Sequence, residues 1–158
     1  PRWAMEKTAK DMMREVRHAL HPEDTIAEAV HRFRQAARME GRPVFGLLVT
    51  DRDHKLAGML SMYDILLFIR PKHIRIWGEM EDLQAEGLYQ NLLQRTRHVQ
   101  VGDLMSCEVL SIRPETHILV IIDLMIKRHV RRLPVVENEN IMGMVYLSDV
   151  FHHILQDI

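Results

Sequence analysis

The chain's most informative stretch is Arg131-Arg132-Leu133-Pro134-Val135-Val136, which is soon followed by Ile141-Met142-Gly143-Met144-Val145-Tyr146-Leu147-Ser148-Asp149. Two cations precede a short β-branched run, and the second apolar run ends in Ser-Asp, a pair that suits the start of a helix. A strand that leads into a helix start is a common place to hold an anion. We therefore expect two strands and a helix here, with an anion site at their junction.

A less complete copy of this pattern occurs earlier in the chain. Leu47–Thr50 is followed by Gly58–Asp64, at an offset that is 143 − 58 = 85 for the glycines. Nearer the start of each copy the offset is 103 − 11 = 92, and the difference belongs in loops. The pairs matched at 92 are Asp11/Asp103, Met13/Met105, Pro22/Pro114, Glu23/Glu115 and Ile26/Ile118. The sequence thus predicts a tandem repeat whose two copies share one core with pseudo-twofold symmetry, because each is small.

Each copy is predicted to run strand, helix, strand, strand, helix, which is an α+β fold. Pro22–Thr25 suits a helix start, with Asp24 or Thr25 as the cap. The expected elements of the first copy are an extended piece at 14–20, a helix from 25, strands at 45–49 and 55–61, and a helix at 63–69. The expected buried stripes are Ile26, Val30, Phe33 and Ala37 in the first copy and Ile118, Ile122 and Met125 in the second. Trp3–Met13 is also compatible with a helix.

Residues 71–100 differ from both copies and predict a helical connector. Trp77, Leu88 and Leu92 lie on an apolar face among acidic residues. This face packs either on the chain's own repeats, which we favour, or on a partner subunit. The predicted domains are therefore 1–70, 71–100 and 101–158.

Composition excludes several classes of function. The 158 residues are 47% hydrophobic and 27% charged, as in an ordinary globular protein. A formal charge of -1 gives no global attraction for nucleic acid, and no apolar run approaches the roughly 20 residues of a membrane span. The single cysteine, Cys107, excludes an internal disulfide and favours a cytoplasmic protein.

No motif for catalysis or metal binding is evident. Ten histidines include His152-His153, which His129 or His117 would have to join, but neighbouring residues on a helix point about 100° apart. No cysteine or carboxylate spacing completes a zinc site. A nucleophile elbow and a phosphate-loop signature are also lacking. We expect neither a metal site nor an enzyme.

Both copies resemble cystathionine-β-synthase (CBS) domains, and the tandem resembles a Bateman module. The resemblance rests on Asp103-Leu104-Met105, Arg131–Val136 and Gly143–Asp149 in the second copy. In the first copy it rests on Asp11-Met12-Met13, Pro22–Ile26 and Gly58–Asp64. It covers the chain except residues 71–100 and implies a regulatory module that binds an adenosine-containing ligand in clefts between paired repeats. No cofactor is required.

The resemblance also implies roles for particular residues. The ribose ligands would be Asp64 and Asp149. The phosphate ligands would be Ser61, Arg131 and Arg132, with Ser148 as a substitute hydroxyl. The adenine would be lined by backbone around Leu20, His21, Ile112 and Arg113, with Pro134 and Val135 as an apolar wall. Carboxylates suit a vicinal diol and guanidinium groups suit phosphate, although these carboxylates also fit as plain helix caps.

The two copies are unequal at these positions. Tyr146 stands in the second copy where the first has Ser61, and Phe45-Gly46 stands where the second has Arg131-Arg132. If each cleft combines the carboxylate of one copy with the cations of the other, Asp64 and Ser61 receive the basic pair and Asp149 receives none. We therefore expect one tight nucleotide per chain.

Two functions from different classes follow from this pattern. The first is a sensor of AMP, ADP or ATP that acts on an unknown effector protein; the sequence does not separate these from S-adenosylmethionine or a dinucleotide. The second is a ligand-free scaffold for dimerisation that keeps the fold. The resemblance implies a homodimer through the helices in either case.

Overall fold

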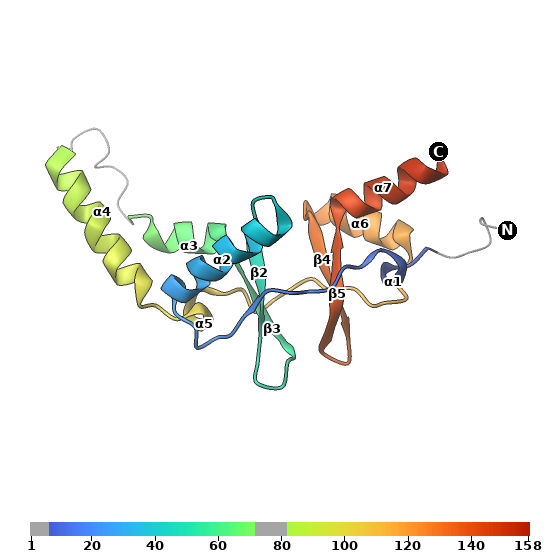
Figure 1. The fold of residues 1–158 in the computed structure, drawn as a ribbon, viewed down its shortest axis with the longest axis horizontal. Coiled ribbons are helices and arrows are strands. Elements are labelled where there is room, and N and C mark those ends of the chain that lie inside the picture. Colours follow the sequence, from blue (N-terminus) through green and yellow to red (C-terminus); the bar gives the residue numbers. More distant parts are fainter. Residues whose placement is uncertain (1–6, 72–81) are drawn as a thin grey trace. The chain divides into compact units, whose positions relative to one another are not determined.

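The computed structural model describes residues 7–71 and 82–158, which divide into two compact units. The unit that contains Asp64, called the Asp64 unit, comprises His18–Asp53 and Ala57–Cys107. The unit that contains Asp149, called the Asp149 unit, comprises Pro1–Arg17, His54–Leu56 and Glu108–Ile158. Each unit combines strands with helices, so the predicted α+β class is confirmed (Figure 1).

The Asp64 unit is built on a three-stranded sheet of order β1-β2-β3. The strands are β1 (Ala19–Leu20), β2 (Gly46–Thr50) and β3 (Leu56–Ser61), and the helices are α2 (Ile26–Glu40), α3 (Met62–Ile69), α4 (Asp82–Arg97) and α5 (Val101–Leu104). β1 runs parallel to β2 because α2 provides the crossover that parallel strands require. The predicted order strand, helix, strand, strand, helix is confirmed in this unit.

Helix α2 begins and ends as its sequence predicts. The Thr25 side chain accepts a hydrogen bond from the Glu28 amide, and the Glu28 carboxylate accepts one from the Thr25 amide. Gly41 ends the helix in a left-handed conformation, with φ 67°. The buried stripe is rotated from the predicted one: Ala29 and Ala36 are buried beside Ile26 and Phe33, whereas Val30 and Ala37 are only partly covered.

Helix α4 confirms that the described part of the connector is helical. It packs against α2 and α3 within its own unit. The Arg95 guanidinium lies 5.2 Å from the ring centre of Phe68 in α3, and Thr96 is buried. The intramolecular interpretation of this helix is therefore supported. Trp77 lies outside the described residues.

The Asp149 unit is built on the hairpin of β4 (Arg132–Glu137) and β5 (Asn140–Tyr146). Asn138 and Glu139 form its turn with φ angles of 52° and 69°, the left-handed values typical of tight hairpins. The helices are α1 (Ala9–Met12), α6 (Ile118–Arg128) and α7 (Leu147–Asp157), so the helix predicted from Trp3 covers only four of the described residues. The first strand of this repeat is reduced to a parallel bridge between Ile112 and Val135.

Short segments are exchanged between the repeats. Arg14, which precedes the first repeat's strand in sequence, forms an antiparallel bridge with Met144 of β5. Ser106, at the matched place before the second repeat, forms the same bridge with Met59 of β3. The compact units therefore do not follow the boundaries 1–70, 71–100 and 101–158, which stay a prediction about the repeats in sequence.

The exchanged segments also contribute residues to the hydrophobic core. Ala9 and Met12 are buried with Ile121 and Val145 of the second repeat, whereas Val101 is buried with residues of the first. The buried apolar residues thus form two clusters, one in each unit. The prediction of one core shared by both repeats is therefore wrong. Each cluster is completed by a short helix of the other repeat, α1 in one case and α5 in the other.

The helices carry no candidate membrane span. Within the two described ranges, none combines the length and the apolar character that crossing a bilayer demands.

Gly143 is required where the exchanged segment crosses β5. A Cβ atom there would lie 2.8 Å from the Arg14 carbonyl oxygen and 3.0 Å from Met13 Sδ. We predict that Gly143→Ala lowers the free energy of unfolding by about 1 to 3 kcal/mol, as overpacking does. Gly87→Ala in α4 is the matched control, since nothing lies within 4 Å of its Cβ. The control should be stabilised by about 0.5 to 1 kcal/mol. Urea unfolding of both variants tests this, and equal stability would contradict it.

Candidate functional site

Two matched junctions hold the predicted ribose and phosphate ligands. At one, the Phe45 carbonyl accepts a hydrogen bond of 2.8 Å from the Met62 amide, the first residue of α3. At the other, the Arg131 carbonyl accepts a bond of 2.8 Å from the Leu147 amide, the first residue of α7. Each bond joins the residue before a strand to the helix that follows the hairpin. Arg131 therefore occupies in the second repeat the place of Phe45 in the first.

The Asp64 junction is a reciprocal capping box. The Ser61 amide donates to Asp64 Oδ2 at 2.8 Å, and the Asp64 amide donates to Ser61 Oγ at 3.0 Å. The helix cap uses one carboxylate oxygen and the acceptor side of one hydroxyl. The second carboxylate oxygen and the hydroxyl proton can still bind a ligand. Both side chains are half-buried, so capping and ligand binding are compatible here.

The Asp149 junction is organised by an ion pair instead. Arg14 donates to both carboxylate oxygens of Asp149, from Nε to Oδ2 at 2.7 Å and from Nη2 to Oδ1 at 2.6 Å. The same guanidinium lies 6.0 Å from the ring centre of Tyr146, which makes no side-chain capping bond to α7. The Asp149 side chain is 15% exposed and the Arg14 side chain 60% exposed. A fork of this kind is the strongest geometry for an arginine–carboxylate pair.

Sequence reasoning missed Arg14. The junction was expected to contain Asp149, Ser148 and Tyr146 without a basic pair, yet the structure places a cation on Asp149. The offset of 92 residues matches Arg14 with Ser106, which marks a charge difference between the repeats. That offset does not reveal which carboxylate the cation meets, because the meeting depends on the exchange of segments.

The predicted phosphate ligands lie on both units. Arg131 is exposed and Arg132 half-buried at the start of β4. Ser148 is exposed in the first turn of α7. The combination of Asp64 and Ser61 with the two arginines in one cleft stays a prediction, since these residues belong to different compact units.

The backbone amides of three predicted adenine-lining residues donate hydrogen bonds. The His21 amide donates to Asp24 Oδ2 at 2.8 Å, and the matched Arg113 amide donates to Thr116 Oγ1 at 3.0 Å. The Ile112 amide donates to the Pro134 carbonyl at 2.9 Å. Leu20 and Ile112 are buried, and so are the predicted wall residues, Pro134 and Val135. The structure thus fixes these positions, while their role toward adenine stays a prediction.

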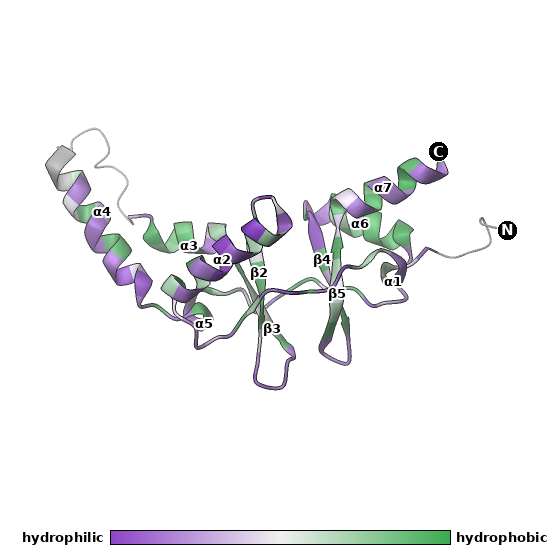
Figure 2. Cartoon of the chain, in the orientation of Figure 1, coloured by the Kyte–Doolittle hydropathy of each residue, from purple (hydrophilic) through white to green (hydrophobic). Residues whose placement is uncertain are grey.

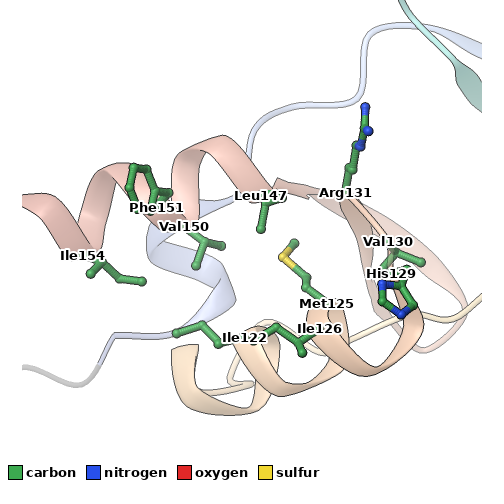
Figure 3. Close-up of a pocket in the computed structure, with 10 residues that line it drawn as sticks. All are labelled: Ile122, Met125, Ile126, His129, Val130, Arg131, Leu147, Val150, Phe151 and Ile154. Carbon is green, nitrogen blue, oxygen red and sulfur yellow. The ribbon is translucent and has the colours of Figure 1, made fainter.

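An apolar groove of about 460 Å³ lies between α6 and α7 of the Asp149 unit. Figure 3 shows side chains of the two helices facing each other across it, while Arg131 extends away at one end. The residues that line it are Ile122, Met125, Ile126, His129, Val130, Arg131, Leu147, Val150, Phe151 and Ile154. With so few polar groups it suits another apolar surface better than a nucleotide.

The histidines do not converge in the parts of the chain that the structure describes. There, no group of three or more His, Cys, Asp or Glu side chains is placed to hold a metal ion. His117 instead caps α6 through an acceptor contact with the Leu119 amide, and His152 contacts Gln156.

Comparison with known proteins agrees with the repeat. The family model described as "CBS domain" matches residues 9–71 and 101–156. The crystal structure of the CBS-pair protein CBSX2 from Arabidopsis thaliana is 27% identical, with a TM-score of 0.72 and 97% of each chain covered. A structure of CBSX2 in complex with AMP is 25% identical, with a TM-score of 0.68, and the match covers 95% of this chain and 97% of that one.

A curated relative in Arabidopsis thaliana is the chloroplastic CBS domain-containing protein CBSX1. It is 28% identical over 149 residues, which is 88% of this chain. A second relative, an uncharacterized 33.4 kDa protein of Thermofilum pendens, is 26% identical over 91 residues. The chain spans 59% and 29% of the lengths of these two relatives.

Proposed function

Because the chain belongs to the CBS domain family, we propose that it is a regulatory module that binds an adenine nucleotide through the carboxylates at its two strand-to-helix junctions. The observation that carries this proposal is the Asp64 junction. There, a half-buried carboxylate keeps one oxygen for a ribose hydroxyl while a serine hydroxyl keeps its proton for a phosphate.

The ligand that we propose is AMP, ADP or ATP. The chemistry favours an adenosine phosphate, since carboxylates accept hydrogen bonds from a diol while Arg131 and Arg132 attract anionic oxygens. The similarity to CBSX2, whose structure was determined with AMP, supports the same choice. We propose Leu20, His21, Ile112 and Arg113 as the adenine environment, with Pro134 and Val135 as its wall, and Ser148 as a second phosphate hydroxyl.

Regulation would follow from differential binding. A nucleotide shifts the chain between conformations only if it binds one of them more tightly, and an effector protein then senses the shift. No reaction is required of the module, so we propose a regulatory rather than catalytic role. The cytoplasmic location expected from the single cysteine stays a prediction, and the relative CBSX1 is named as chloroplastic.

A second candidate function, a dimerising scaffold, is favoured by the exposed apolar helix faces. Leu119, Ile126 and Phe151 are exposed on α6 and α7, and Figure 2 shows hydrophobic residues along both helices. Exposed apolar surface of this kind marks an interaction site. We propose a homodimer in which a second copy covers the groove of the Asp149 unit, a contact that is compatible with the sensor function.

The Asp64 carboxylate should contribute directly to nucleotide affinity. We predict that Asp64→Ala weakens AMP binding roughly 5- to 150-fold, because removing one partner of a buried hydrogen bond costs about 1 to 3 kcal/mol. Isothermal titration calorimetry measures the change, with thermal unfolding to show that the variant is folded without its cap. Asp53→Ala, in an exposed turn, is the control and should bind as the wild type does. An unchanged dissociation constant in Asp64→Ala would reject the assignment.

The two arginines before β4 should discriminate by charge. Replacing both Arg131 and Arg132 with Ala should weaken AMP about tenfold or more while adenosine, which has no phosphate, keeps its affinity. Parallel titrations with AMP and adenosine test this expectation. Equal losses for the two ligands would assign the arginines a structural role. No binding of AMP, ADP or ATP to the wild type would favour the scaffold.

The homodimer predicts a sensitive position on α7. Phe151 is 59% exposed and lines the groove, so Phe151→Glu would bury an unpaired charge in the dimer and should yield monomers. Met39→Glu, at a residue 64% exposed near the end of α2, is the control and should leave the dimer intact. Light scattering at micromolar concentration gives the masses. A monomeric wild type would overturn the dimer and leave the nucleotide proposal standing.

A further inference from the structure

We infer that Arg14 is a ligand-specificity residue of the Asp149 junction, where it selects phosphorylated adenosine over adenosine. Without ligand, the Arg14 guanidinium binds the Asp149 carboxylate. When a nucleotide binds, its ribose displaces the guanidinium from Asp149, and the guanidinium then binds the phosphate of the same nucleotide. This inference rests on the proposed function and adds to it a residue and a selection rule.

The position of Arg14 supports both halves of this exchange. Its fork occupies both oxygens of Asp149, the carboxylate proposed to bind ribose, at 2.6 and 2.7 Å. The same group lies 6.0 Å from the ring centre of Tyr146, which takes the place of Ser61, the proposed phosphate ligand of the other junction. One cation therefore lies beside both the ribose position and the phosphate position, in a junction where Tyr146 replaces the serine hydroxyl.

The energetics make the exchange selective. The fork has favourable geometry, but the Arg14 side chain is 60% exposed, so solvent weakens the pair and competition from Arg14 lowers ribose affinity about fivefold. Adenosine must break this pair and offers the displaced guanidinium no anion. A nucleotide breaks the same pair but provides a phosphate, for which the guanidinium fork is well suited. The preference for a nucleotide thus arises because only a nucleotide provides a phosphate that the displaced guanidinium can bind.

Only the side chain of Arg14 has to move. Its backbone is fixed to β5 by two hydrogen bonds, from the Arg14 amide to the Met144 carbonyl at 2.8 Å and from the Met144 amide to the Arg14 carbonyl at 2.9 Å. Ser106 makes the same two bonds with Met59 at the matched place in the Asp64 unit, and it has no charge. Selection by this route therefore operates at the Asp149 junction and not at the Asp64 junction.

The test isolates the Asp149 junction in an Asp64→Ala background. AMP and adenosine are titrated by calorimetry into Asp64→Ala and Asp64→Ala/Arg14→Ala. We expect Arg14→Ala to weaken AMP about tenfold or more, while adenosine binds equally well or up to about fivefold more tightly. Asp64→Ala/Arg17→Ala is the matched control and should behave as its parent, since Arg17 is an exposed residue paired with Glu15 at 3.8 Å. Circular dichroism shows that each variant is folded.

Each result decides between the claims. A loss of AMP affinity that adenosine does not share supports the inference, and loss of the remaining binding in Asp64→Ala/Asp149→Ala locates it at this junction. Unchanged AMP affinity on removal of Arg14, equal losses for both ligands, or no AMP binding in the Asp64→Ala background would overturn the inference alone. No binding of AMP, ADP or ATP to the wild type would instead overturn the proposed function on which it rests.

Discussion

The antiparallel bridges at Met144 and Met59, each beside a glycine, determine how this chain is assembled. At each, a segment from before one repeat crosses a strand of the other so closely that an added Cβ would lie within 3 Å of a backbone oxygen. Glycine makes these approaches possible because it has no side chain. Once the segments are in place, α1 and α5 supply apolar residues to the two clusters. The repeats therefore complete each other by exchange of short segments.

The same bridges explain why the two junctions differ. Arg14 and Ser106 occupy matched places along β5 and β3, so a single difference in side chain brings a cation to Asp149 and a neutral hydroxyl to the other unit. At the Asp64 junction, Ser61 and Asp64 satisfy each other through a capping box. At the Asp149 junction a tyrosine replaces the serine, and the carboxylate pairs with Arg14. A duplicated backbone thus holds two carboxylates in different electrostatic surroundings.

Much of the fold was predictable from local patterns. Thr25, Glu28 and Gly41 bound α2 by signals that act within a few residues, and the glycine and aspartate of each repeat lie at matched places in strand and helix. Two predictions about the core failed. The stripe on α2 was displaced because Ala29 and Ala36 face the core, and small residues give little periodic signal. The single shared core was wrong because no local pattern reveals which repeat an exchanged segment joins.

In the candidate site, too, the residues in local motifs were predicted and the residue placed by a distant contact was not. Ser61, Asp64 and Asp149 were identified from strand-to-helix motifs, and the match of Arg131 with Phe45 is supported by equivalent hydrogen bonds to the first residues of α7 and α3. Arg14 escaped notice because it lies 135 residues from its carboxylate partner, in a segment whose place depends on a bridge. An arginine has to compete with solvent to hold a carboxylate, and this one is largely exposed. Such a contact contributes little to stability. The position of Arg14 beside Asp149 and Tyr146 therefore has its main effect on which ligand can displace the guanidinium.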